Sequence, residues 1–152
     1  MQSKAADDFF HSAVTFCSII ENFNSNQEEN KLKNLLVSLL DLYSKALHLP
    51  DVEPENDEFI EVKLSLPQIN FRQCDNYWEV FNPYEFEEPL VASLSDDILG
   101  IYGDVKKGIV LYEQNQEIEA IWQWKFGLEI HWGSHAVDAV RALHSVIFQD
   151  ID

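Results

Sequence analysis

The stretch "SLSDDILGIYGDVKKGIVLYE", residues 93–113, is the strongest structural signal in the chain. Ser93 or Ser95 can accept a hydrogen bond from the first free amides of a helix. Asp96 and Asp97 then fall in the first turn, where the helix dipole favours negative charge. Apolar side chains follow at helical spacing, at Leu94, Ile98, Ile101, Tyr102, Val105, Ile109 and Tyr112. The sequence therefore predicts a helix that begins here.

Three glycines interrupt this predicted helix, at positions 100, 103 and 108. Glycine inside a helix costs roughly 1 kcal/mol relative to alanine. Their presence indicates either close packing against a neighbouring element or a kink.

Helical periodicity extends to both sides of this stretch. Upstream, apolar residues recur every three or four positions over residues 5–21 and 31–49, and Pro50 ends the second helix. Downstream, "QNQ" (114–116) turns the chain into a last helical segment that runs to about residue 149, with a bend expected at Gly133.

These segments predict an all-α fold, an antiparallel helical bundle of about four to five helices. The chain is taken as a single helical domain over residues 1–152, because a chain of about 150 residues can bury a sizeable core. Residues 94–149 form a helical hairpin in this prediction.

The region between the second and third helices is less regular. "DVEPENDE" (51–58) has five acids and one proline, so residues 50–58 are read as an acidic connection. "FIEVKLSLP" (59–67) alternates apolar and polar residues as a strand does, but one strand is not stable alone. It either pairs, for example with "YWEVF" (77–81), or lies as an irregular stretch across the helices. We favour the second, and expect irregular or short extended structure over residues 59–90.

Charge restricts the partners. Twenty-seven acidic against ten basic residues give a net charge of −17 and a pI near 4.4. Such a chain repels the phosphates of nucleic acids and anionic lipids, and a protein with a basic surface is a better partner. The N-terminus, "MQSKAADDFF", carries acids where a signal peptide needs bases, and no apolar run reaches membrane-spanning length. We expect a cytoplasmic protein with no contact to membranes or nucleic acid.

Three segments resemble a known family: "SLSDD" (93–97), "WQWKF" (122–126) and "HWGSHA" (131–136). They are similar to segments of a bacterial family of small acidic helical proteins of unknown function, of the DUF5063 type. The resemblance covers roughly the second half of the chain and implies a helical fold and a bacterial origin. The chain departs from the family pattern at Gly100 and Gly103, where a stronger helix former is usual. The resemblance implies no catalytic residues.

A metal site is one interpretation of "EIHWGSHAVDAV" (129–140). His131, His135 and Asp138 fall on one flank of a helix, and two imidazoles with one carboxylate suit a divalent ion such as zinc, manganese or iron. The alternative, which we favour, is that these histidines pair with acids or cap carbonyls, so that no cofactor is bound. The carboxylates that face inward by pattern are Asp97, Asp104 and Glu129.

Glu129 is a second anomaly, because an ideal helical wheel places it near the centre of the apolar stripe. A buried carboxylate needs a partner or a proton. It is either an acid or base in a cleft or, as we favour, a structural group that pairs with Lys125 or accepts a hydrogen bond from Tyr102 or Tyr112.

Aromatic residues mark the candidate interaction surface. Trp124 lies off the apolar stripe, so it either packs beneath the segment 77–89, which we favour, or is exposed beside Tyr77 and Trp78 and marks a protein partner. The leading hypothesis is an acidic, cytosolic, non-enzymatic interaction or accessory module, with a homodimer as one arrangement. The alternative is a metal-binding bundle or metal-dependent hydrolase that uses His131, His135 and Asp138.

Overall fold

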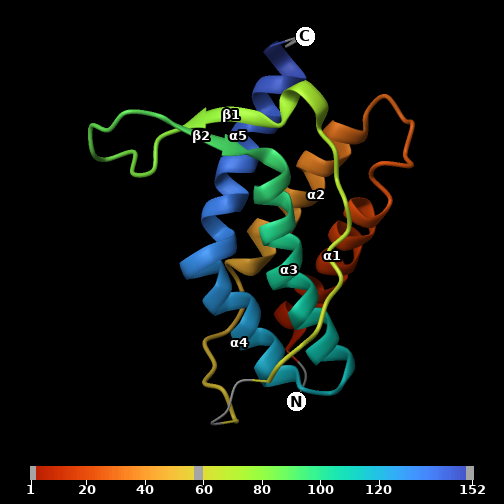
Figure 1. The fold of residues 1–152 in the computed structure, drawn as a ribbon. Coiled ribbons are helices and arrows are strands. Elements are labelled where there is room, and N and C mark those ends of the chain that lie inside the picture. The colour runs from red at the N-terminus through yellow and green to blue at the C-terminus, as the bar shows by residue number, and fades with distance from the viewer. Residues whose placement is uncertain (1–2, 57–59, 150–152) are drawn as a thin grey trace.

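The helix expected from residue 93 onward is present in Figure 1, a computed structural model that describes residues 3–56 and 60–149. The helices are α1 (Lys4–Glu21), α2 (Lys31–Ala46), α3 (Leu94–Glu113), α4 (Glu117–Gly127) and α5 (Gly133–Gln149). A 3-10 turn η1 (Arg72–Cys74), strands β1 (Asn76–Glu79) and β2 (Leu90–Ser93), and a π-helical segment η2 (Leu128–Trp132) complete the elements. The predicted helical bundle is confirmed.

The start of α3 is capped from two directions. The Ser93 hydroxyl accepts a hydrogen bond from the Asp96 amide at 3.2 Å, as its position predicts. Asp75 adds a second cap, because its carboxylate accepts from the Ser95 amide and from the Ser93 hydroxyl, both at 2.8 Å. Burial raises the pKa of Asp75, but these hydrogen bonds outweigh it and hold the pKa below its usual value. The turn before β1 is thereby fixed to the start of α3.

Two of the three glycines in α3 allow close packing, which confirms the first of the two explanations. A Cβ atom at Gly108 would lie 2.0 Å from Nε1 of Trp124, so only glycine admits the indole ring there. That nitrogen donates to the Val105 carbonyl at 2.9 Å. A Cβ at Gly100 would lie 3.2 Å from the His135 ring, whereas one at Gly103 would meet nothing closer than Leu66 at 3.9 Å.

The chain between α2 and α3 has little regular structure before η1. Residues 60–71 cross the helices as an extended trace (Figure 1), with Ile69 and Phe71 buried in the core. The irregular alternative is confirmed for residues 60–66, and β1 pairs with β2 instead. Within the acidic connection, Glu119 of α4 accepts hydrogen bonds from the amides of Glu55 and Asn56. Residues 57–59 of the two predicted segments lie outside the described residues.

Helices α4 and α5 follow one another through η2 without a break. A π-helical turn holds an extra residue compared with an α-helical turn. Glycine is required at its end, because a Cβ at Gly133 would lie 2.1 Å from the Leu128 carbonyl oxygen. The irregularity expected at Gly133 therefore occupies Leu128–Trp132, immediately before it.

Candidate functional site

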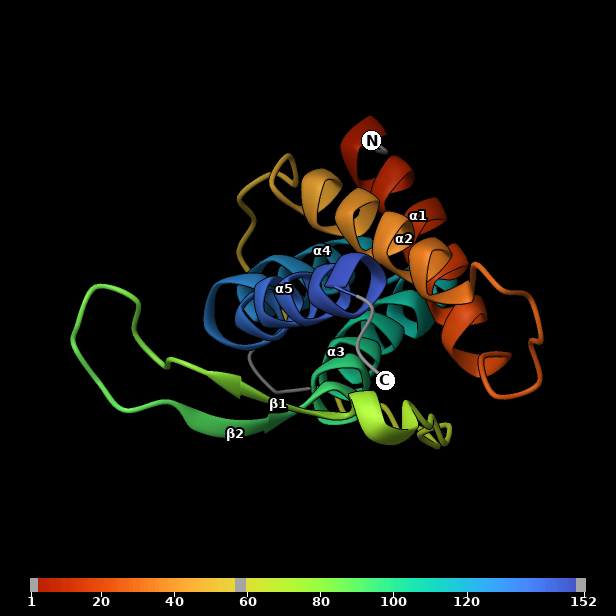
Figure 2. The same ribbon diagram turned by 90° about the horizontal axis from the view of Figure 1, so that it is seen from above.

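The strands β1 and β2, with the loop that joins them, project sideways from one end of the bundle (Figures 1 and 2). We call residues 76–93 the arm. The strands pair antiparallel, with Trp78 opposite Val91 and Tyr77 opposite Ala92. Along β1, exposure alternates, so that Tyr77 and Glu79 are half-buried against the bundle while Trp78 is exposed.

The free surface of the arm is apolar and aromatic. The large exposed side chains are Trp78, Val80, Phe81, Tyr84, Phe86, Leu90 and Val91. Tyr84 and Phe86, at the far end, are 96% and 105% exposed. Scattered exposed apolar residues are ordinary, but a group of them on one projection is typical of a binding surface. The arm also has four glutamates and no lysine or arginine.

Asp97 joins the base of the arm to two helices. It lies at the start of α3 and is only 4% exposed. One oxygen accepts a short hydrogen bond from the Tyr77 hydroxyl of β1, and the other lies 2.7 Å from Nδ1 of His135 in α5. The Asp97 bond is the main cause of a raised pKa at His135, and burial opposes it. The carboxylate therefore fixes the orientation of both rings.

The two predicted histidines lie side by side, with ring centroids 4.9 Å apart. Nδ1 of His131 is 2.7 Å from a carboxylate oxygen of Asp104, so each imidazole has its own aspartate from α3. Gly100 leaves room for both rings, because a Cβ there would contact His135 at 3.2 Å and His131 at 3.7 Å. Asp97 and Asp104, predicted to face inward, are the partners of the histidine pair.

Asp138, the third residue of the predicted metal set, contacts Glu79 of the arm. Burial, followed by the hydrogen bond and the charge of Glu79, raises the pKa of Asp138 to about 7. Two carboxyl groups in contact are stable when they share a proton. In the described parts of the chain, no three histidine, cysteine or acidic side chains are grouped as metal ligands. The metal site thus remains a prediction.

Trp124 is not part of the exposed surface, and its assignment beside Tyr77 and Trp78 is wrong. Its ring is fully buried between Gly108 and the aromatic rings of Phe9 and Tyr112. The ring is packed, but against α1 and α3, so the favoured prediction that it lies beneath residues 77–89 is also wrong.

Glu129 is exposed, so the prediction of a buried carboxylate is also wrong. The wheel assumed a regular α-helix, whereas η2 changes the rotation per residue at this position. The three side chains proposed to bond to Glu129 have other partners. Their contacts are instead Lys125 with the Leu49 carbonyl and Asp51, Tyr102 with Glu21, and Tyr112 with Asp7.

Sequence reasoning did not identify Phe81, Tyr84 and Phe86 as surface residues. They lie in "FNPYEFEEP" (81–89), where aromatic residues are mixed with proline and glutamate without a regular spacing. The absence of any helical or strand period over these apolar residues is the signal that could have marked them as exposed.

By its fold, the protein is a small helical bundle that carries an aromatic and acidic arm. The chain belongs to the DUF5063 family, a domain of unknown function, whose sequence model matches residues 1–149. Protein BF1032 from Bacteroides fragilis has a similar crystal structure, with a TM-score of 0.80 and 23% identity over 96% of this chain and 94% of that one. No curated protein matches the chain. Over the described residues, every helix is too short or too polar to cross a bilayer.

Proposed function

We propose that this chain is a cytoplasmic protein-interaction module whose arm binds a partner protein with an apolar groove edged by basic residues. The observation that carries the proposal is the set of exposed aromatic side chains on a projection that the bundle does not need for its core. Buried aromatic anchors supply most of the binding energy in protein interfaces.

The charge of the arm selects the partner. Glu85, Glu87 and Glu88 lie among the aromatic residues along the sequence of the arm, and no base lies between residues 76 and 93. The whole chain carries −17, so a basic partner is attracted from a distance and an anionic membrane surface is repelled. Two copies joined through their arms would bring these glutamates together, which disfavours a homodimer at this surface.

The base of the arm supports the same function. A two-stranded hairpin is marginally stable by itself. Here Tyr77 is bonded to Asp97 and Glu79 contacts Asp138, which hold the hairpin at a defined angle to the bundle. Orientation of the arm before binding reduces the entropy that association costs.

A photo-crosslinking amino acid in place of Tyr84 identifies the partner in cells, and calorimetry with the purified partner then tests the arm. We expect Phe81→Ser with Phe86→Ser to weaken binding by at least about 30-fold, since two anchor residues each contribute more than 1 kcal/mol. The matched control, Val37→Ser with Leu47→Ser, removes two exposed apolar residues of the α2 region and leaves the affinity unchanged.

Increasing salt concentration should weaken the complex, because screening reduces attraction between opposite charges. A dissociation constant that does not change with salt contradicts the basic partner. Crosslinks to this same chain alone, with a dimer in native mass spectrometry, contradict the proposal in favour of self-association.

A divalent metal at the histidine pair is a second candidate function. The observation in its favour is that a carboxylate holds Nδ1 of both His131 and His135, as is usual for histidines that bind metal through the other nitrogen. Elemental analysis of untagged protein tests it. A metal site requires close to one metal ion per chain in the unsubstituted protein and its loss in His135→Ala. Trace metal at the same level in both proteins would contradict it.

A further inference from the structure

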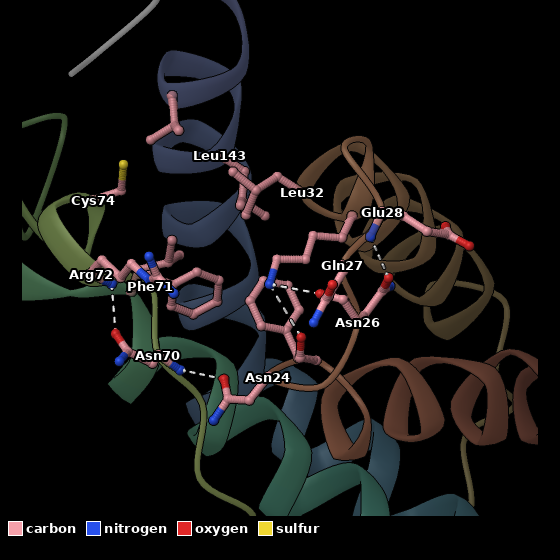
Figure 3. Close-up of a pocket in the computed structure, with 14 residues that line it drawn as sticks. Asn24, Asn26, Gln27, Glu28, Leu32, Asn70, Phe71, Arg72, Cys74 and Leu143 are labelled. Atoms are coloured by element: carbon pink, nitrogen blue, oxygen red, sulfur yellow. Dashed lines mark hydrogen bonds between the residues drawn. The ribbon is translucent and has the colours of Figure 1, made fainter.

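A cavity of about 490 Å³ opens between the loop after α1 and the turn η1, and none of its lining residues belongs to the arm (Figure 3). Its floor is apolar and consists of Phe23, Phe71, Leu94 and Leu143, all buried, with Leu32 and Val146 beside them. Its volume lies in the range of small-molecule sites, which are commonly apolar with a few polar groups at fixed positions.

The rim of this cavity carries positive charge, which is scarce in this chain. Lys31 and Arg72 both line it, although the whole sequence has only ten lysines and arginines against 27 acids. In the described ranges 3–56 and 60–149, neither of these two bases forms an ion pair. The other polar groups at the rim are Asn24, Asn26, Gln27, Glu28 and Asn70.

Hydrogen bonds hold the two walls in place. The Asn24 side chain donates to the Gln68 carbonyl and accepts from the Asn70 amide, both at 3.0 Å. The Asn70 side chain in turn accepts from the Arg72 amide at 2.7 Å. Two segments more than 40 residues apart are therefore joined at the mouth, and the cavity is formed before any ligand arrives.

Arg72 has a backbone φ of 57°, in the left-handed region that arginine rarely adopts. Strained positions of this kind persist where the surrounding structure holds them, and they are concentrated at ligand sites. The conformation places an exposed guanidinium at the cavity, with its donors free of ion pairs in the part of the chain that the structure describes.

Lys31 approaches the same space from the start of α2. Its ammonium lies 4.4 Å from the centre of the Phe23 ring and donates to the carbonyls of Phe23 and Asn26 at 3.3 and 3.2 Å. An ammonium has three protons, so one remains for a ligand. Figure 3 shows the carboxylate of Glu28, the one acid at the rim, directed away from Arg72.

We infer that this cavity binds a small organic carboxylate, with its apolar body against Phe23 and Phe71 and its carboxylate between Arg72 and Lys31. A guanidinium matches a carboxylate through two parallel hydrogen bonds, and the apolar floor excludes a fully polar anion such as free phosphate. No residue of the arm lines this site.

Titrations followed by proton–nitrogen NMR, with three probes at up to about 10 mM, suit the weak affinity of small fragments. We expect 4-phenylbutyrate to shift the amides of residues 23–32 and 70–74. Its neutral amide, 4-phenylbutyramide, should bind at least about 10-fold more weakly, because it lacks the charge that Arg72 and Lys31 recognise. Inorganic phosphate should leave these amides unchanged.

The substitution that tests the charge is Arg72→Gln, with Lys33→Gln on the exposed side of α2 as the matched control. Arg72→Gln should raise the dissociation constant of 4-phenylbutyrate about 10-fold, as the loss of a bidentate charged pair implies, while Lys33→Gln changes it less than about 2-fold. Arg72→Gly should weaken binding equally and raise the melting temperature, because glycine adopts this φ without strain.

Four results would overturn the inference: no shift of these amides by the carboxylate, equal binding of the neutral amide, shifts with phosphate of the same size, or a dissociation constant that Arg72→Gln does not change. The NMR spectrum of each variant also reports whether the bundle is folded, so a loss of binding by unfolding is recognised directly.

Discussion

Trp124 and Trp78 are the same residue type in opposite environments. Trp124 is fully buried, rests on Gly108 and donates to a backbone carbonyl of α3, whereas Trp78 is 70% exposed on the arm. The bundle uses its large aromatic residues to fill a core that glycine shapes. The arm keeps an apolar surface in water, where burial in the core cannot account for it, and this difference is the basis for proposing that the arm binds a partner.

The largest expected difference between the two regions is in stability. Trp124→Ala should lower the free energy of unfolding by about 3–5 kcal/mol, the usual cost of a large buried aromatic. Trp78→Ala should change it by less than about 0.5 kcal/mol, as for an exposed side chain. Urea unfolding followed by circular dichroism measures both. Equal losses would show that the arm belongs to the core.

Adding a single methyl group tests the glycine contact itself. Gly108→Ala should cost about 1–3 kcal/mol, because the new Cβ overlaps the indole ring of Trp124. Gly103→Ala is the matched control in the same helix and should be neutral or stabilising by up to about 1 kcal/mol, since a Cβ there would meet only Leu66, at an ordinary contact distance of 3.9 Å, and alanine favours helix. If Gly108→Ala instead gains stability as Gly103→Ala does, helix propensity and not packing decides the outcome at both positions.

The hydrogen bond at the base of the arm should have a smaller, local effect. Tyr77→Phe removes the donor to Asp97 and should cost about 1–1.5 kcal/mol, with faster hydrogen exchange confined to residues 76–93. Tyr43→Phe is the control, because the Tyr43 hydroxyl makes no hydrogen bond within the described residues. Exchange that accelerates throughout the bundle would contradict a role limited to the arm.

The smallest expected effect is the pH dependence of stability that arises from Asp138 and His135 at the base of the arm. The pKa of Asp138 is raised to about 7 by burial and by Glu79, and that of His135 is raised mainly by the Asp97 hydrogen bond. A folded state with raised pKa values binds more protons than the unfolded state, so this stabilisation is complete below the unfolded pKa and is lost as the pH rises through the folded pKa.

The melting temperature should therefore fall between pH 5 and pH 8, and Asp138→Asn should remove the larger part of that fall. The carboxyl groups with lowered pKa values, such as Asp75, act in the opposite sense but only at more acidic pH. Thermal melts of the two proteins across this range measure the difference. A fall of the same size in the variant would place the titrating group elsewhere.

Regular periodicity explains what could be predicted from the sequence. The start of α3 at Ser93 and the inward direction of Asp97 and Asp104 follow from local rules of capping and helical spacing. The prediction that Glu129 is buried was wrong because a helical wheel assumes a regular α-helix and does not include a π-helical turn. The cavity beside Arg72 was invisible for a different reason, since tertiary structure alone brings its two walls together.

The π-helical segment also has a consequence for comparing members of the family. An α-helix turns by about 100° per residue, so the one additional residue within Leu128–Trp132 determines which way every later side chain of α5 points. An aligned relative that lacks one position between Trp124 and His135 would rotate its imidazole away from the aspartate of α3, even if both residue types were present. Spacing as well as residue identity would therefore decide whether a relative keeps the histidine pair.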